Sequence, residues 1–117
     1  MKLSLSMIVR NADEGKYSKC LESIVPFVDE VCIADTGSTN NCQDVAVQVC
    51  KDVGVKLALK DYKDPSPHPE HGWISNFANA RNFAQDLVTG DVWCWIDADT
   101  YLTQGADWRT AIDRHFI

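Results

Sequence analysis

The sequence predicts an α/β protein with a doubly wound, mostly parallel four-stranded sheet and helices on both faces. Short apolar segments alternate with segments of helical spacing along the whole 117-residue chain. The apolar segments are continuous, as is typical of strands that are buried on both faces of a parallel sheet. Since crossovers between parallel strands are right-handed, the helices are expected to cover both faces of that sheet.

The first strand and helix are expected at residues 3–9 and 17–28. The strand is a short apolar run, and the helix carries apolar side chains at helical spacing. Asp13 or Ser18 is the expected N-cap of the helix, and Pro26 ends its regular part.

The second strand is expected at residues 31–34, and the helix after it is capped by Thr39 or Asn40. Gly54 is placed to end this helix, because glycine readily adopts the left-handed conformation common at helix C-termini. The apolar face of the helix is predicted to consist of Val45, Val49, Cys50 and Val53. The third strand is expected at residues 55–59.

A loop is expected at residues 61–72, which contain three prolines and two histidines. The helix at residues 74–87 follows, and Gly90 closes it. Its apolar stripe is predicted to consist of Phe77, Ala80, Ala84 and Leu87. The fourth strand is expected at residues 92–96 and the last helix at residues 106–116.

Composition and charge indicate one soluble domain over residues 1–117. Hydrophobic residues make up 45% of the chain and charged residues 24%, and 17 acidic against 11 basic residues give a net charge of −6. That charge repels a phosphate backbone, so no nucleic-acid partner is expected. No apolar run reaches the ~18 residues of a membrane span. The apolar stretch at the start of the chain is too short for a signal peptide and is followed by charged residues.

The five cysteines are expected to be reduced and the compartment to be the cytoplasm. They are Cys20, Cys32, Cys42, Cys50 and Cys94. Their number is odd and none forms a C-x-x-C pair, which argues against a disulfide framework or a zinc site. Trp93 and Trp95, on either side of Cys94, are expected in the core.

Polar side chains follow three of the predicted strands, which places a candidate site at their carboxyl ends. Arg10 and Asn11 follow the first strand, residues 35–40 follow the second, and Asp97 and Asp99 follow the fourth. Ligands of open α/β sheets bind at that rim.

Two carboxylates two residues apart, Asp97 and Asp99, suit a hard divalent cation such as Mg²⁺ or Mn²⁺ with a substrate's phosphate oxygens. Alternatively, they cap a turn and face solvent.

The turn with Gly37 and Ser38 could present backbone N–H groups and a hydroxyl to an anion or a ribose, or could be purely structural. It is not a P-loop, and no G-x-G-x-x-G follows the first strand. Arg81, on the third helix, could reach a phosphate or pair with a carboxylate. The ligand-capable loop residues His68, Glu70 and His71 are expected to be solvated.

Taken together, these segments resemble the nucleotide-binding half of a GT-A glycosyltransferase of family 2, whose members are inverting enzymes. The segments that carry the resemblance are residues 5–11, 20–24, 28–31, 35–40, 77–82 and 90–99. They match in order and spacing across nearly the whole chain. The resemblance implies a Rossmann-like sheet with strand order 3-2-1-4.

The resemblance also implies a site for a nucleotide-sugar donor. The implied nucleotide-binding residues are Ile8, Arg10, Asn11, Asp35, Gly37, Ser38, Arg81 and Asp97. Asp35 would hydrogen-bond the base. Asp97 and Asp99 would be the D-x-D pair that holds Mn²⁺ or Mg²⁺, with Asp99 the direct ligand, and the cation would neutralise the diphosphate as the sugar–phosphate bond breaks.

The sequence departs from the family at Asn40 and Thr100, where family members often have acidic residues. The half that carries the acceptor pocket and catalytic base is not found in these 117 residues, and Asp107 and Asp113 are not candidates for that base. Donor binding is therefore expected of this chain, and transfer only with an acceptor side supplied by an oligomer or partner.

The absence of that half is expected to expose the edge of the fourth strand, and self-association through this edge or the last helix is predicted. One alternative is a non-catalytic relic that serves as a folded assembly module. Another is a flavodoxin-like or receiver-like domain, which fits the order of strands and helices but leaves residues 79–82 without a role.

Overall fold

A computed structural model describes residues 1–65, 70 and 76–116 and confirms the predicted α/β class. Its four parallel strands lie in the order β3-β2-β1-β4. The strands are β1 (Leu3–Val9), β2 (Glu30–Asp35), β3 (Lys56–Asp61) and β4 (Val92–Trp95). The helices are α1 (Glu14–Ile24), the short 3₁₀ helix η1 (Val25–Phe27), α2 (Cys42–Val53), α3 (Phe77–Asp86) and α4 (Gly105–His115).

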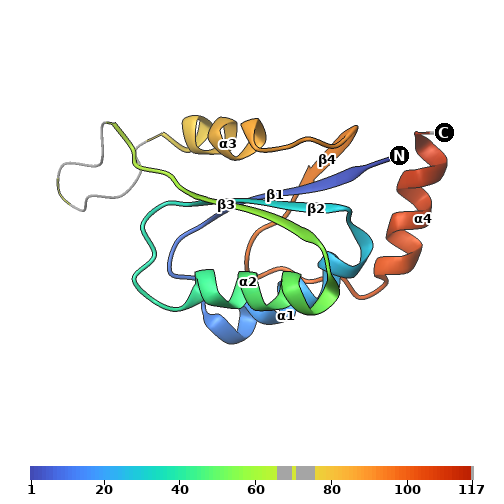
Figure 1. The fold of residues 1–117 in the computed structure, drawn as a ribbon, viewed down its shortest axis with the longest axis horizontal. Coiled ribbons are helices and arrows are strands. Elements are labelled where there is room, and N and C mark those ends of the chain that lie inside the picture. Colours follow the sequence, from blue (N-terminus) through green and yellow to red (C-terminus); the bar gives the residue numbers. More distant parts are fainter. Residues whose placement is uncertain (66–69, 71–75, 117) are drawn as a thin grey trace.

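The helices cover the two faces of the sheet unequally. Helices α1 and α2 lie together on one face, and α3 lies alone on the other (Figure 1). The chain builds outward from β1 through β2 to β3, and then crosses to the other side of β1 to form β4. The carboxyl ends of β1 and β4 are therefore the topological switch point, where ligands of such sheets bind.

The start of α1 distinguishes between the two predicted caps. Asp13 is the N-cap, and its Oδ1 accepts a hydrogen bond from the backbone N–H of Lys16 at 2.9 Å. The helix begins three residues earlier than the apolar spacing suggested, because Glu14 and its neighbours form an exposed first turn. Pro26 lies in η1, where the regular helix has ended as predicted.

Helix α2 ends where predicted and begins slightly later. Gly54 has a φ of +84°, the left-handed conformation that ends the helix. Asn41 is the N-cap position, and the Asn40 Oδ1 accepts from the backbone N–H of Cys42 at 3.2 Å. The predicted apolar face is wrong at Val53, which is 41% exposed, because the helix turns Ala46 toward the sheet instead.

The principal core lies between the sheet and the helices α1 and α2. Alternate residues of β1 point into it, as the two-residue period of a strand requires. These residues are Leu3, Leu5, Met7 and Val9, which pack with Tyr17, Leu21, Ile24, Val31 and Ile33. On the other face, α3 presents the small residues Ala80 and Ala84, both buried.

The prediction that Trp93 and Trp95 belong to the core is wrong, since their side chains are 40% and 52% exposed. Strand β4 is an edge strand that pairs with β1, and α3 packs over β1 and β2 rather than over β4. The predicted stripe of α3 is wrong at Phe77 for a related reason. Phe77 is 64% exposed because it lies in the first turn of α3, at the margin of the sheet.

The buried carboxylate of Glu30 joins β2 to β1 and to the loop before β4. Its oxygens accept hydrogen bonds from Ser4 Oγ at 2.8 Å, and from the backbone N–H and Oγ1 of Thr89, each at 2.6 Å. Burial by itself would raise the pKa of Glu30. The bonds from Thr89 and Ser4 outweigh that effect and lower the pKa to about 2.

All five cysteines are free thiols, as predicted, and four of them are buried. Burial raises the pKa of Cys32 to about 12 and those of Cys50 and Cys94 to about 11, so these thiols stay protonated. Within the described ranges, no helix is long and apolar enough to span a bilayer.

Candidate functional site

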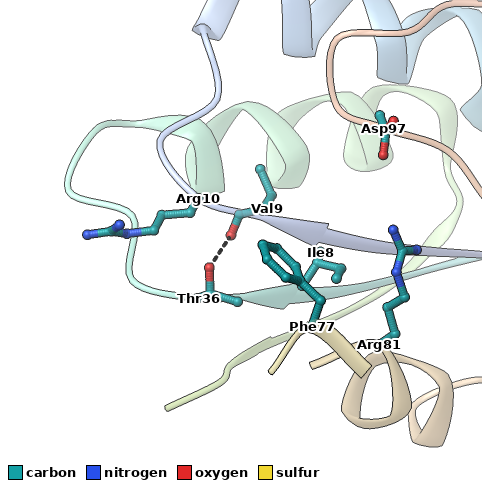
Figure 2. A pocket seen from close by; sticks show the side chains of 7 residues that line it. All are labelled: Ile8, Val9, Arg10, Thr36, Phe77, Arg81 and Asp97. Carbon is teal, nitrogen blue, oxygen red and sulfur yellow. Dashed lines mark hydrogen bonds between the residues drawn. The ribbon is translucent and has the colours of Figure 1, made fainter. Parts of the chain in front are cut away.

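A cavity of about 320 Å³ opens at the switch point between β1 and β4 (Figure 2). It is lined by Ile8, Val9, Arg10, Thr36, Phe77, Arg81 and Asp97. These residues come from the ends of β1 and β2, from α3 and from the segment after β4. Four of them were predicted site residues: Ile8, Arg10, Arg81 and Asp97. The structure thus brings together side chains that are up to 89 positions apart in the chain.

Asn11 connects the loop after β1 to the turn after β2. Its backbone N–H donates to Ser38 Oγ at 2.9 Å, and its Oδ1 accepts from the backbone N–H groups of Thr39 and Asn40 at 2.6 and 3.2 Å. Its φ of +48° places it in the left-handed region, which asparagine tolerates better than most residues. Asn11 and Ser38 therefore shape the rim through these bonds and do not line the cavity.

Asp35 is buried at the end of β2 and holds the turn that follows. Its Oδ1 accepts from the backbone N–H groups of Gly37 and Ser38 at 2.9 and 2.7 Å. Burial would raise the pKa of Asp35, but these hydrogen bonds outweigh it and the pKa lies below its usual value. The turn brings Thr36 to the cavity, with its Oγ1 3.4 Å from the Val9 carbonyl oxygen.

Gly37 has a φ of +119°, a conformation that side chains rarely adopt. A Cβ there would lie 3.7 Å from the Nε of Arg10, so the turn passes close to the arginine side chain. Figure 2 shows Arg10 extending away from the other charged groups of the cavity. The glycine is thus required by the shape of the turn rather than by contact with the cavity.

Arg81 and Phe77 reach the cavity from α3. Figure 2 shows the Phe77 ring beside Ile8 and the Arg81 side chain extending from the helix toward the segment that carries Asp97. The Arg81 guanidinium carbon lies 3.9 Å from the centroid of the Trp95 ring, within the range of a cation–π interaction. The cavity therefore has an apolar surface formed by Phe77 and Ile8, with Arg81 and Asp97 to one side of it.

The D-x-D segment forms a turn after β4, in which the Thr100 N–H donates to the Asp97 carbonyl at 3.0 Å. Asp97 lines the first cavity, while Asp99 lines an adjoining cavity of about 400 Å³ with Asp13 and Lys16. Both cavities share Ile8, Val9 and Arg10. The two carboxylates thus line adjoining cavities that meet at the end of β1.

Cys20 fixes this turn to α1, since its thiol lies 3.6 Å from the Asp97 carbonyl. Burial raises the pKa of Cys20 to about 11, and the negative charges of Asp99 and Asp97 add to this effect. The thiol is therefore a neutral donor. Among the residues the structure describes, no group of three or more His, Cys, Asp or Glu side chains could hold a metal ion by itself.

The remaining polar candidates lie elsewhere. His68 and His71 lie outside the described residues, and Glu70 is exposed. Asp107 and Asp113 are on α4, at the end of the sheet where the chain begins (Figure 1). Arg109 fixes that helix there, bonding Asp113 Oδ1 at 2.9 Å and the Phe27 and Met1 carbonyls at 2.9 and 3.1 Å.

The sequence prediction missed Thr36 and Phe77 as cavity residues. Thr36 stands between two better signals, Asp35 and Gly37, and Phe77 fits the apolar spacing of its helix. The usable signal is that both lie within segments that carry the family resemblance, residues 35–40 and 77–82.

The family model described as glycosyl transferase family 2 matches residues 4–114 of this chain. Among curated proteins, a TPR repeat-containing protein of Synechococcus elongatus is 35% identical over 101 residues, which are 86% of this chain and 21% of that protein. An uncharacterized glycosyltransferase of Rickettsia typhi is 27% identical over 103 residues, or 88% of this chain and 30% of that protein. The chain thus spans less than a third of either relative.

Two solved structures share the fold. The crystal structure of TarS residues 1–349 from S. aureus in complex with UDP-GlcNAc superposes with a TM-score of 0.69 and 22% identity, covering 99% of this chain and 33% of that one. The mannosyltransferase PcManGT from Pyrobaculum calidifontis, in complex with GDP-Man and Mn²⁺, gives a TM-score of 0.70 and 17% identity, covering 95% of this chain and 31% of that one.

Proposed function

The chain belongs to glycosyl transferase family 2, and on that basis we propose that it binds a nucleotide-diphosphate sugar, the donor in transfer of the sugar to an acceptor. Its α/β sheet has the GT-A architecture of the solved relatives. Since it spans about a third of their chains, the acceptor side of the reaction belongs in this proposal to further chain or to a partner.

The observation that carries the proposal is that the switch-point cavity places an apolar surface beside the cationic side chain of Arg81. Phe77 and Ile8 offer an aromatic and an aliphatic surface against which a flat base packs. Arg81 offers a delocalised cation with several N–H donors, which matches the oxygens of a diphosphate. A nucleoside diphosphate combines these two chemistries in one molecule.

The turn after β2 completes the nucleotide site in this proposal. Asp35 contributes by holding the turn, and with it Gly37 and Ser38, so that Thr36 faces the base and ribose. Asn11 supports the same turn from β1. The resemblance implied that Asp35 accepts a hydrogen bond from the base. Its side chain is 1% exposed, its Oδ1 already accepts two backbone N–H groups and its Oδ2 lies 3.9 Å from the Cys42 thiol, so in this proposal Asp35 acts by holding the turn.

Asp97 and Asp99 fit a divalent cation that the donor brings with it. Both are carboxylates, the hard oxygen ligands that Mg²⁺ and Mn²⁺ prefer. Two such side chains do not form a complete protein cage, and a cation held by one or two carboxylates typically completes its coordination with phosphate oxygens and water. When bound, the cation would neutralise the diphosphate leaving group, which also lets a chain of net charge −6 accept an anionic ligand.

Calorimetric titration of the chain with UDP and with GDP, each with Mn²⁺ and with EDTA, tests this function. We expect saturable binding of one nucleotide in Mn²⁺ and much weaker binding of that nucleotide in EDTA. The reason is that the cation offsets the repulsion between the diphosphate and the carboxylates of Asp97 and Asp99. Binding of neither nucleotide by the folded chain would contradict the proposal and favour the alternative, a non-catalytic relic that serves as an assembly module.

The five free thiols support a reducing compartment, and we place this activity in the cytoplasm.

We further propose that two copies associate through the β4 edge or through α4. Among the strands that the structure describes, β4 ends the sheet beside β1 and carries the half-exposed rings of Trp93 and Trp95, so a second copy could add a strand at this edge. Sedimentation velocity over a wide range of concentrations is expected to show a dimer, and Trp93→Lys or Phe116→Glu to dissociate it. Sedimentation as a monomer at every concentration would exclude association.

A further inference from the structure

We propose that Trp95 is a positioning residue, whose indole ring holds the Arg81 guanidinium in place for the diphosphate. The inference rests on the proposed donor site and adds to it a residue that does not line the donor cavity. Trp95 is the last residue of β4, two positions before Asp97. The end of β4 and the turn after it therefore supply both the ring that supports the Arg81 guanidinium and the acidic residue Asp97.

The geometry places Arg81 between two cavities. On one side it lines the donor cavity with Asp97 and Phe77. On the other side it lines a small cavity of about 50 Å³, whose wall includes Trp93 and Trp95. The guanidinium carbon stands 3.9 Å from the centroid of the Trp95 ring. Arg81 thus lines the donor cavity while its guanidinium stacks on a ring that lines the small cavity.

A neutral ring is well suited to this task. When a ligand orders a solvent-exposed arginine, the side chain loses the rotational freedom of several bonds, which costs conformational entropy. An arginine that already stacks on an aromatic ring has lost part of that freedom before the ligand binds, so binding costs less. A carboxylate partner would also order the side chain, but it would neutralise the positive charge of the guanidinium that attracts the diphosphate. The indole has the largest quadrupole attraction for a cation among the aromatic side chains and leaves the guanidinium N–H groups available.

Trp95 presents an accessible ring to Arg81. With Arg81 in place, 52% of the Trp95 side chain is still exposed. Arg81 reaches one face of the ring from α3, a helix that packs mainly over β1 and β2. Trp93 lies on the same strand and the same face with 40% exposure and provides a control of matched chemistry.

The test compares Trp95→Leu with Trp93→Leu in Mn²⁺, using UDP or GDP, whichever the wild type binds, and the matching nucleoside. Trp95→Leu is expected to weaken binding of the diphosphate by about tenfold, the scale of one partly desolvated cation–π contact, and to leave nucleoside binding unchanged. Trp95→Phe should restore part of the loss and Trp93→Leu should match wild type. In an Arg81→Ala background, Trp95→Leu should have no further effect.

An NMR measurement makes the inference independent of ligand affinity. The Arg81 side-chain protons should be shifted upfield by the indole ring current in wild type and in Trp93→Leu, and not in Trp95→Leu. Equal diphosphate binding by wild type and Trp95→Leu, or an equal additional loss in the Arg81→Ala background, would overturn the positioning role while leaving the donor site intact. Failure of the wild type to bind either nucleotide would instead overturn the proposed function, and this role with it.

Discussion

Replacing Glu30 by glutamine is expected to lower the free energy of unfolding by about 3 kcal/mol near neutral pH. The carboxylate is 1% exposed and accepts three hydrogen bonds from Ser4 and Thr89. An amide at the same position would turn an NH₂ group toward at least one of these donors, so a buried donor would lose its acceptor. The loop before β4 would then be held to β1 mainly by the remaining bonds from Gly90 to Ser4 Oγ and between Asp91 and Lys2.

The pH dependence of stability provides the distinguishing measurement. The folded-state pKa of about 2 lies below the ordinary value of 4.5, so the stabilisation is present above about pH 5 and is lost as the pH falls toward 2. Urea unfolding of wild type should therefore show a larger stability loss over that range than Glu30→Gln, which keeps only the contribution of other carboxylates with lowered pKa values, such as Asp35. Glu22→Gln, at an exposed glutamate of α1, is the control and should keep the wild-type profile. Parallel acid profiles of wild type and Glu30→Gln would contradict the expectation.

Asp99→Asn is expected to weaken Mn²⁺-dependent binding of the nucleotide by about 100-fold, since the amide keeps the shape of the side chain but loses the charge that holds the cation. Binding in EDTA should not change. Asp97→Asn should have a smaller effect, because Asp97 lines the same cavity as Arg81 and its removal also leaves that cavity more positive.

Asp107→Asn provides the matched control for this measurement. Asp107 is an exposed aspartate in the first turn of α4, remote from the carboxyl ends of the strands. Calorimetry of all three variants with Mn²⁺ should rank them with Asp107→Asn like wild type and Asp99→Asn weakest. An Asp99→Asn variant that binds as tightly as wild type in Mn²⁺ would remove Asp99 from the metal site.

The elements of the fold were predictable because their signals are local. Continuous apolar strands, the Asp13 cap and the left-handed Gly54 are each properties of a few consecutive residues, and the structure confirms them. The exposure of Trp93 and Trp95 depends instead on which strand occupies the edge and on where α3 lies. Apolar composition does not carry that information, which is why the core assignment of both tryptophans is wrong.

The sequence predicts which segments form the site, but it does not predict which side chain of each segment faces which cavity. Strand ends predicted the rim, and Arg81 and Asp97 do line one cavity there. The orientation of a side chain in a turn depends on the hydrogen bonds around it, so Asp35 is buried and Thr36 faces the cavity. In the same way, the turn after β4 directs Asp97 and Asp99 to different cavities.

The strand order has a consequence for synthesis on the ribosome. Strand β1 is made first and lies in the interior of the sheet, yet its partners arrive at very different times. Pairing with β2 needs residues up to Asp35, whereas pairing of Leu3 and Ser6 with Val92 and Trp95 waits for β4. Contacts of such long sequence separation form late and slow the folding of the whole sheet. A nascent chain therefore carries a βαβαβ unit whose β1 has one unpaired side between the synthesis of β3 and that of β4, and the proposed nucleotide-binding rim is completed only when β4 pairs there.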